Sequence, residues 1–196
     1  MNLIKTFRIL LVSSFLIILT VSCAINKKDN DKVWNLVMKE GLLYKDSLAT
    51  EPFTGHYEGK VMGKKIEFDV VDGKKNGIFV IYNQNGNVET IGYIENEKNY
   101  GEWKYYYPNG VLESVGKFRE DKPDSVWNWY YMTGTVKQTG EFSGGKKHGE
   151  WKYYDDFGNH YLTMKYKNDE LKDSISYELP VVQEESIVDT LYKESN

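Results

Sequence analysis

The sequence is poor in cysteine, histidine and proline, and each shortage excludes a class of protein. One Cys in 196 residues excludes a disulfide within the chain. Three His without Cys partners supply no zinc site of the usual nitrogen and sulfur type, so we expect no metal and no cofactor. Four Pro against sixteen Tyr and five Trp disfavour a disordered chain, because large aromatic side chains bury enough apolar area to fold.

A short apolar run near the N-terminus predicts a targeting segment. Lys5 and Arg8 precede residues 9–21, which are apolar except for two Ser and one Thr. This run is shorter than the roughly 20 apolar residues that a membrane-spanning helix needs. We therefore predict a signal peptide over residues 1–22. Its removal deletes both cations and takes the formal net charge from −4 to −6, which disfavours nucleic acid as a partner.

The single Cys of the chain follows this run directly. Ser22-Cys23 resembles the lipobox of bacterial lipoproteins, in which a small residue precedes the Cys that is acylated. The resemblance implies that Cys23 carries palmitate or a related acyl chain and holds the protein at the outer membrane of a cell envelope. Residues 23–40 then form the acylated Cys and a polar linker. An ordinary secretory peptide with an incidental Cys and an uncleaved N-terminal helix remain as alternatives.

A repeat of 24 residues fills the body of the chain, residues 41–177. Its units lie near residues 55–76, 77–100, 101–124, 125–148 and 149–172, and the first is two residues shorter than the others. In the full units the third residue is Phe79, Trp103, Trp127 or Trp151, the sixth is Tyr82, Tyr106, Tyr130 or Tyr154, and the tenth is Gly86, Gly110, Gly134 or Gly158. The sixteenth is Gly92, Gly116 or Gly140, and Met164 replaces Gly in the last unit.

Each unit has the pattern of a β-hairpin. Residues 102–107 and 111–118 alternate in polarity, and Asn109-Gly110 between them is a tight-turn pair. The Gly at the tenth position predicts a positive φ. Segments 95–100, 119–124 and 143–148 are rich in charge, Asn and Gly, and we predict that they connect one hairpin to the next.

Tandem hairpins predict the fold class. One hairpin cannot bury enough apolar area to fold alone, so neighbouring units must stack. We predict an all-β protein, an elongated, twisted antiparallel meander in an open single-layer sheet. Equivalent residues of adjacent units lie two strands apart, or about 10 Å. Tryptophans of adjacent units are therefore expected not to touch, and to pack around an intervening residue such as Phe118.

The repeat resembles a known family. The stretches from Gly101 to Gly110 and from Gly149 to Tyr154 resemble the MORN variant repeat, and Pro52-Phe53-Thr54-Gly55 resembles the opening of the YwqK-type MORN repeat family. The resemblance implies an open, twisted antiparallel meander. It also implies two kinds of function, because many members are labelled antitoxins and others are scaffolds proposed to bind lipid or protein. The antitoxin label suits an exported lipoprotein poorly, since such a protein does not meet a cytoplasmic toxin.

Two columns of the repeat are candidate binding residues. The lysine column at the twenty-second position is predicted to line one edge of the sheet, where it would suit an acidic partner or anionic lipid headgroups. The tyrosine column at the sixth position lies three residues from the third-position aromatics, hence on the opposite face of a regular strand, and would form an aromatic groove for a protein or glycan. Solvated turn lysines and locally packed tyrosines are the alternatives. The lysine column consists of Lys74, Lys98, Lys122 and Lys146.

No catalytic residues are predicted. Glu102 and Glu150 share a column, but Val126 occupies it between them, so their carboxylates are expected to lie about 20 Å apart. A glycan hydrolase would need a close carboxylate pair, so we predict that the protein is not an enzyme. Residues 178–196 are predicted to form an acidic tail, with an alternative short helix around Ile187 and Leu191.

These observations together predict a non-enzymatic lipoprotein of the cell envelope whose repeat sheet binds a protein. An antitoxin or immunity-type inhibitor is one alternative, and binding of lipid headgroups or glycans through the lysine or aromatic columns is another.

Acylation of Cys23 is directly testable. Cells that express the protein and are fed a labelled fatty acid should label the wild-type chain, and Cys23→Ser should abolish the label because the chain has no other Cys. Equal labelling of both chains, normalised to protein amount, would remove the lipoprotein assignment.

Overall fold

A computed structural model describes residues 36–180 of the chain. The predicted signal peptide, Cys23, most of the linker and residues 181–196 of the predicted tail lie outside the described residues. Within residues 36–180, no helix is long and apolar enough to cross a membrane.

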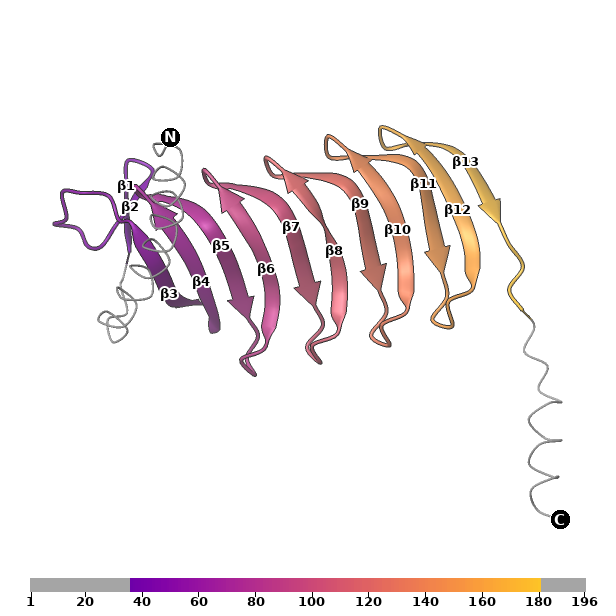
Figure 1. The fold of residues 1–196 in the computed structure, drawn as a ribbon, viewed down its shortest axis with the longest axis horizontal. Helices are drawn as coiled ribbons and strands as arrows, with labels where there is room; N and C mark the ends of the chain where they lie inside the picture. Colours follow the sequence, from indigo (N-terminus) through magenta and orange to yellow (C-terminus); the bar gives the residue numbers. More distant parts are fainter. Residues whose placement is uncertain (1–35, 181–196) are drawn as a thin grey trace, which may run out of the picture. The chain divides into compact units, whose positions relative to one another are not determined.

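The described chain is all-β, as predicted (Figure 1). A two-stranded sheet pairs β1 with β2, and eleven strands form an open antiparallel sheet in the order β13-β12-β11-β10-β9-β8-β7-β6-β5-β4-β3. Strands adjacent in sequence are therefore adjacent in the sheet, which is the meander of consecutive hairpins that the repeat predicts. The strands are β1 (Val37–Lys39), β2 (Leu42–Tyr44), β3 (Gly55–Val61), β4 (Lys64–Val71), β5 (Lys74–Tyr82), β6 (Val88–Glu95), β7 (Lys98–Tyr106), β8 (Leu112–Arg119), β9 (Lys122–Tyr130), β10 (Val136–Ser143), β11 (Lys146–Tyr154), β12 (His160–Lys167) and β13 (Glu170–Ser176).

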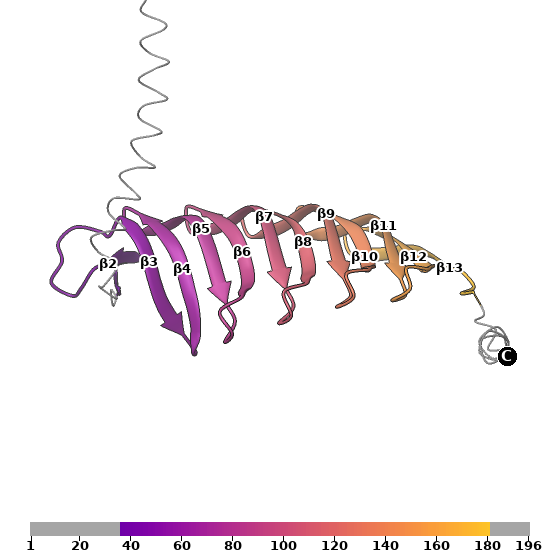
Figure 2. The ribbon, with the colours of Figure 1, turned by 60° about the horizontal axis from the view of Figure 1, so that its bottom comes forward.

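The chain divides into two compact units. Among the described residues, the first contains residues 36–110 together with Phe118–Asp121, and the second contains Val111–Lys117 and residues 122–180. The strands of each unit lie in one curved layer (Figure 2). In each unit we call the side that carries the third-position aromatic residues the tryptophan face and the other side the opposite face.

Two kinds of turn join the strands. The glycines at the tenth position have φ between 83° and 90°, as predicted, because the turn at that end of each hairpin needs a left-handed residue. The connectors at the other end are shorter than predicted. The strands extend into the polar segments, so only two residues remain in each turn. Both have positive φ, as in Asn96 (49°) and Glu97 (68°).

Carboxylates in the short turns accept hydrogen bonds from backbone N–H groups of the preceding repeat. Asn99 N–H donates to Asp121 Oδ1 (2.7 Å), and Lys147 N–H donates to Asp169 Oδ1 (2.8 Å). Pro123 occupies the equivalent donor position and has no N–H, and the residue that would supply its carboxylate is Gly145. The missing donor and the missing acceptor therefore occur together.

The third-position tryptophans pack flat against glycines of the preceding strand. A Cβ on Gly116 would lie 2.0 Å from Trp127 Cδ2, and Trp127 Nε1 donates to the Lys117 carbonyl (3.1 Å). Trp103 and Trp151 repeat this arrangement, with their rings over Gly92 and Gly140 and their Nε1 atoms on the Tyr93 and Glu141 carbonyls. Each of these glycines lies eleven residues before the tryptophan that covers it. In the last unit the glycine is replaced by Met164, and the residue eleven positions later is Ile175 instead of Trp. The sixteenth-position glycine is thus present where a tryptophan ring needs its space.

Aromatic contacts run along the tryptophan face of each unit. In the second unit Phe142 lies between Trp127 (6.1 Å between ring centroids) and Trp151 (5.0 Å), and in the first unit Trp103 meets Phe118 edge-on at 5.8 Å. The expectation that tryptophans of adjacent repeats do not touch is wrong, because Trp129 contacts Trp151 at 5.5 Å. Trp129 is the fifth residue of its repeat and points to the same face as the third.

The N-terminal end of the first unit is covered by the β1-β2 hairpin and the segment after it. Leu43 and Phe53 form a buried cluster with Phe68 and Val70. Backbone bonds fix the cover, because Leu43 N–H donates to the Gly73 carbonyl (2.8 Å) and Gly73 N–H to the Phe53 carbonyl (2.8 Å). This hairpin caps the tryptophan face where the first, shorter repeat begins.

The tryptophan–glycine contact predicts an unequal response to two alanine substitutions. Gly116→Ala should destabilise the protein by about 2–3 kcal/mol, since the new methyl group collides with the Trp127 ring. Gly134→Ala has open space around its Cβ and should cost only about 1 kcal/mol, from its positive φ. Urea unfolding of both variants measures the difference, and equal costs would contradict this packing.

Candidate functional site

A row of exposed apolar side chains crosses three strands of the first unit on the opposite face. Ile78 of β5 pairs in register with Tyr93 of β6, and Tyr93 pairs with Tyr100 of β7. Their exposed fractions are 55%, 44% and 43%. Cross-strand partners share a face, so the three side chains form one continuous row, which we call the Ile78 row.

A polar network lies beside the Ile78 row on β3, β4 and β5. His56 Nδ1 lies 2.8 Å from Asp69 Oδ1, and Asp69 Oδ2 accepts the N–H of Ile78 (3.1 Å). The Tyr82 hydroxyl donates to Glu67 Oε2 (3.1 Å), whose other oxygen lies 2.7 Å from Lys65 Nζ. The network therefore fixes the side chains along one border of the Ile78 row.

The electrostatics of this network follow from its contacts. The hydrogen bond to Asp69 raises the pKa of His56 above its usual value of 6.5, and partial burial opposes this rise. Burial, and then the hydrogen bond to Glu67, raise the pKa of Tyr82. The carboxylates are thus engaged with local cations and donors. No group of three or more His, Cys, Asp or Glu suited to a metal occurs in the described residues.

The tyrosine column is partly covered in the structure. All four of its members are half-buried. The ring of Tyr82 lies beneath Lys65 Nζ (5.0 Å), and the ring of Tyr154 packs on His160 (5.2 Å). Tyr82 and Tyr154 therefore make local packing contacts, and the role of the column in binding stays a prediction.

The lysine column is exposed at the start of β5, β7, β9 and β11. Lys98 Nζ lies 3.3 Å from Glu120 Oε2, so part of its charge is balanced. The other three members have no ion pair among the described residues. The column therefore has the exposure that a binding edge needs, but a carboxylate stands beside one of its members.

The Ile78 row was missed by the sequence analysis, although the repeat contained a signal for it. Its three residues occupy columns in which other units carry charged or smaller residues. Tyr93 corresponds to Lys117, Glu141 and Lys165. A large apolar residue in a column that is otherwise charged is therefore the signal.

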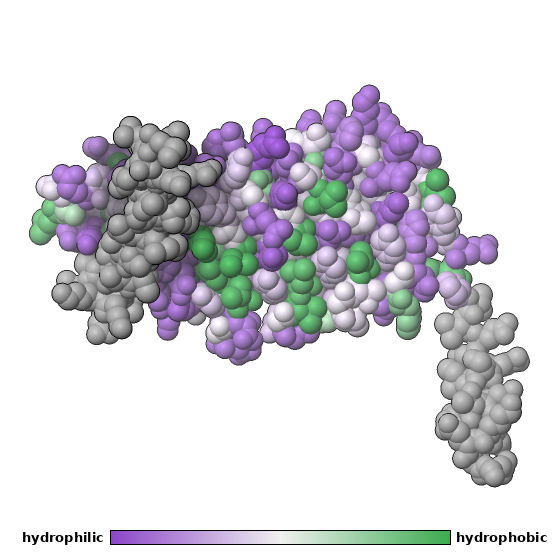
Figure 3. Space-filling model, in the orientation of Figure 1, coloured by the Kyte–Doolittle hydropathy of each residue, from purple (hydrophilic) through white to green (hydrophobic). Residues whose placement is uncertain are grey.

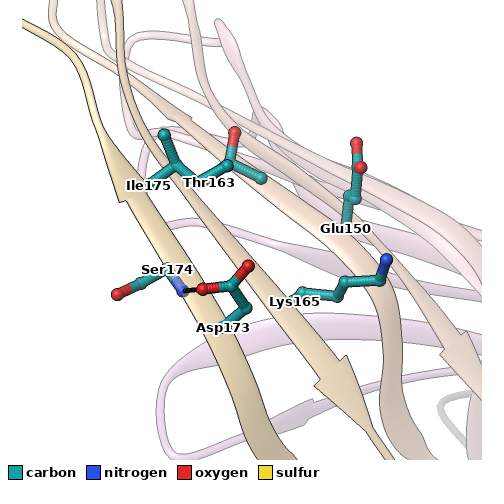
Figure 4. Close-up of a pocket in the computed structure, with 6 residues that line it drawn as sticks. All are labelled: Glu150, Thr163, Lys165, Asp173, Ser174 and Ile175. Carbon is teal, nitrogen blue, oxygen red and sulfur yellow. Dashed lines mark hydrogen bonds between the residues drawn. The ribbon is translucent and has the colours of Figure 1, made fainter.

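A shallow hollow lies on the second unit, between β11, β12 and β13 (Figure 4). Its charged residues are cross-strand neighbours, since Glu150 pairs in register with Lys165 and Lys165 with Asp173. Figure 3 shows apolar side chains interspersed with polar ones on the displayed face of each unit. The hollow is lined by Glu150, Thr163, Lys165, Asp173, Ser174 and Ile175.

Comparisons with known proteins identify the repeat. The family described as MORN repeat variant matches residues 99–120 and 147–168, so the chain carries MORN repeats. Among solved structures, it is similar to one described as accessory secretory protein 1, 2 and 3 of Streptococcus pneumoniae, with 13% identity and a TM-score of 0.17. That match covers 74% of this chain and 22% of the other. A comparison with the curated proteins gives no match.

The His56–Asp69 pair predicts a pH dependence of stability. Because the folded-state pKa of His56 is raised, its stabilising contribution is complete below about pH 6.5 and is lost as the pH rises through the folded-state value. The stability advantage of wild type over His56→Gln should therefore shrink on going from acid to alkaline solution. Denaturant unfolding across this range measures it. Asp69→Asn should flatten the dependence, and an unchanged profile in that variant would contradict the assigned cause.

Proposed function

We propose that the protein is a non-enzymatic scaffold whose repeat sheet binds another protein. The MORN repeats at residues 99–120 and 147–168 support a scaffold role. With Cys23 acylated, as its lipobox-like setting suggests, the scaffold would work at the outer membrane of a cell envelope. Acylation and location belong to the proposal and rest on the sequence pattern alone.

The Ile78 row is the observation that carries this proposal. Large apolar side chains that stay exposed on adjacent strands usually mark an interaction surface, and Tyr is enriched in protein interfaces. The neighbouring polar network holds one border of the row in place, which reduces the ordering cost of binding.

Site-specific crosslinking in living cells tests this proposal. A photoreactive amino acid at Tyr93 should give one discrete adduct with another protein, because this position lies at the centre of the Ile78 row. Ile78→Lys in the same chain should remove the adduct, since it places a charge in the contact. Its side chain is 55% exposed, so the substitution should leave thermal stability nearly unchanged.

Glu141 supplies the matched control. It occupies the same column of the repeat as Tyr93 and is also exposed on a second strand of its hairpin. The photoreactive residue at position 141 should give no such adduct. Adducts of equal yield at both positions, or an adduct that survives Ile78→Lys, would overturn the assignment of the row as the binding surface.

A further inference from the structure

One hairpin turn of the second unit carries an aromatic side chain at its tip. Phe157 lies in the turn between β11 and β12 and is 82% exposed. The equivalent ninth position of the other full repeats is Asn85, Asn109 or Thr133. Asn favours turns because its side chain can bond to nearby backbone groups, and Phe supplies no such bond. The turn itself therefore does not account for an aromatic side chain at this position.

Hydrogen bonds fix the backbone of this turn and so hold Phe157 at a defined place. The Asp155 carboxylate accepts the N–H groups of Phe157 (3.1 Å) and Asn159 (2.7 Å), and also the side-chain amide of Asn159 (2.9 Å). Gly158 N–H donates to the Asp155 carbonyl (3.1 Å), and Asp155 N–H donates to the Asn159 carbonyl (3.0 Å). Binding of the exposed ring would therefore cost little backbone ordering.

A second exposed apolar side chain lies on the neighbouring turn. Met132, in the turn between β9 and β10, is 56% exposed. The two turns lie side by side at one edge of the second unit (Figure 1), and the Tyr131 hydroxyl of one donates to the Tyr154 carbonyl at the start of the other (2.8 Å). Phe and Met are both enriched in protein interfaces. We call the two adjacent apolar tips, Met132 and Phe157, the turn patch.

The charges beside the turn patch indicate the chemistry of its partner. Asp156 immediately precedes Phe157, is exposed, and has no ion pair within residues 36–180. The hydrogen bond from the side chain of Asn159 lowers the pKa of Asp155, so this second carboxylate is charged at neutral pH. Two carboxylates beside an exposed aromatic ring complement a Lys or Arg on a partner, and they are repelled by an anionic surface.

We propose that the turn patch binds a protein whose surface offers an apolar pocket for Phe157 and, at the border of that pocket, a Lys or Arg that pairs with Asp156. Met132 would lie on the rim of the pocket and exclude water from it. An anionic membrane is the less suitable occupant, because insertion of Phe157 would carry Asp155 and Asp156 toward headgroups of the same charge. The proposal is independent of the Ile78 row, since it concerns the second unit and a different surface.

A replacement taken from the other repeats separates binding from folding. Phe157→Asn installs the residue that two other turns carry at this position. The melting temperature should therefore stay within about 2 °C of the wild-type value, as expected for an exposed position. A clearly larger fall would show that the ring stabilises the turn, and would overturn its assignment as a binding residue.

Crosslinking in living cells tests the binding role. A photoreactive amino acid at Met132 should give a discrete adduct with another protein, and Phe157→Asn in the same chain should lower the yield about tenfold. Pro108 is the matched control, because it occupies the same exposed eighth position on a turn tip of the first unit. The photoreactive residue at position 108 should give no such adduct. Ile78→Lys should leave the adduct unchanged, so failure of this proposal is distinguishable from failure of the Ile78 row.

The captured protein, identified from the adduct by mass spectrometry and purified, tests the chemistry. Phe157→Asn should raise its dissociation constant roughly tenfold, and Asp156→Lys should weaken binding more at low salt than at high salt. Exchange of the partner's Lys or Arg nearest the crosslink for Glu should restore binding to the Asp156→Lys chain.

Several outcomes would overturn the proposal. They are equal adducts at positions 108 and 132, an adduct that survives Phe157→Asn, and a dissociation constant insensitive to the charge at position 156. An adduct formed only with a second copy of this chain would assign the turn patch to self-association instead. Flotation of the Cys23→Ser chain with phosphatidylcholine–phosphatidylglycerol vesicles, lost in Phe157→Asn, would assign it to lipid.

Discussion

The tryptophan ring lying flat on a glycine of the preceding strand is the contact on which the repeat sheet depends. A single-layer sheet has no second layer to cover its aromatic residues, so each large side chain must be buried against its neighbours in the same sheet. The glycine lets the ring lie against the backbone, and the indole N–H donates to the carbonyl of the residue that follows the glycine. Trp151, which bonds to Glu141 in this way, is only 1% exposed. Removing either partner would leave a gap or a collision, which explains why Gly gives way to Met164 where Ile175 takes the place of Trp.

The turns show a second coupling between repeats. The carboxylates of Asp121 and Asp169 accept N–H groups 22 residues earlier, so each turn is held by the one before it. Where Pro123 removes the donor, Gly145 removes the acceptor, so neither partner is left without the other. Packing on the strands and hydrogen bonding at the turns therefore carry the same 24-residue period, and both make each repeat dependent on its neighbour.

This dependence has a consequence for function. Positions that hold the repeats together are occupied by Trp, Gly and turn carboxylates, and the remaining exposed positions are free to vary. Charge fills most of them, as in the column of Lys117, Glu141 and Lys165. The Ile78 row is a place where large apolar residues stay exposed instead, on a face of the first unit. It is therefore the surface at which a binding partner is proposed.

The sequence alone determined the period, the hairpins, the left-handed glycines and the meander order, because these follow from local alternation and from steric limits on φ. It also identified the aromatic columns, but it could not show that the rings of Trp129 and Trp151 approach to 5.5 Å or that Tyr82 is half-buried beneath Lys65. The Ile78 row needed the tertiary structure as well. Its members are 15 and 7 residues apart along the chain, and the strand register brings them opposite one another. Which residues lie opposite one another depends on the register of strand pairing, and a single sequence indicates that register only indirectly.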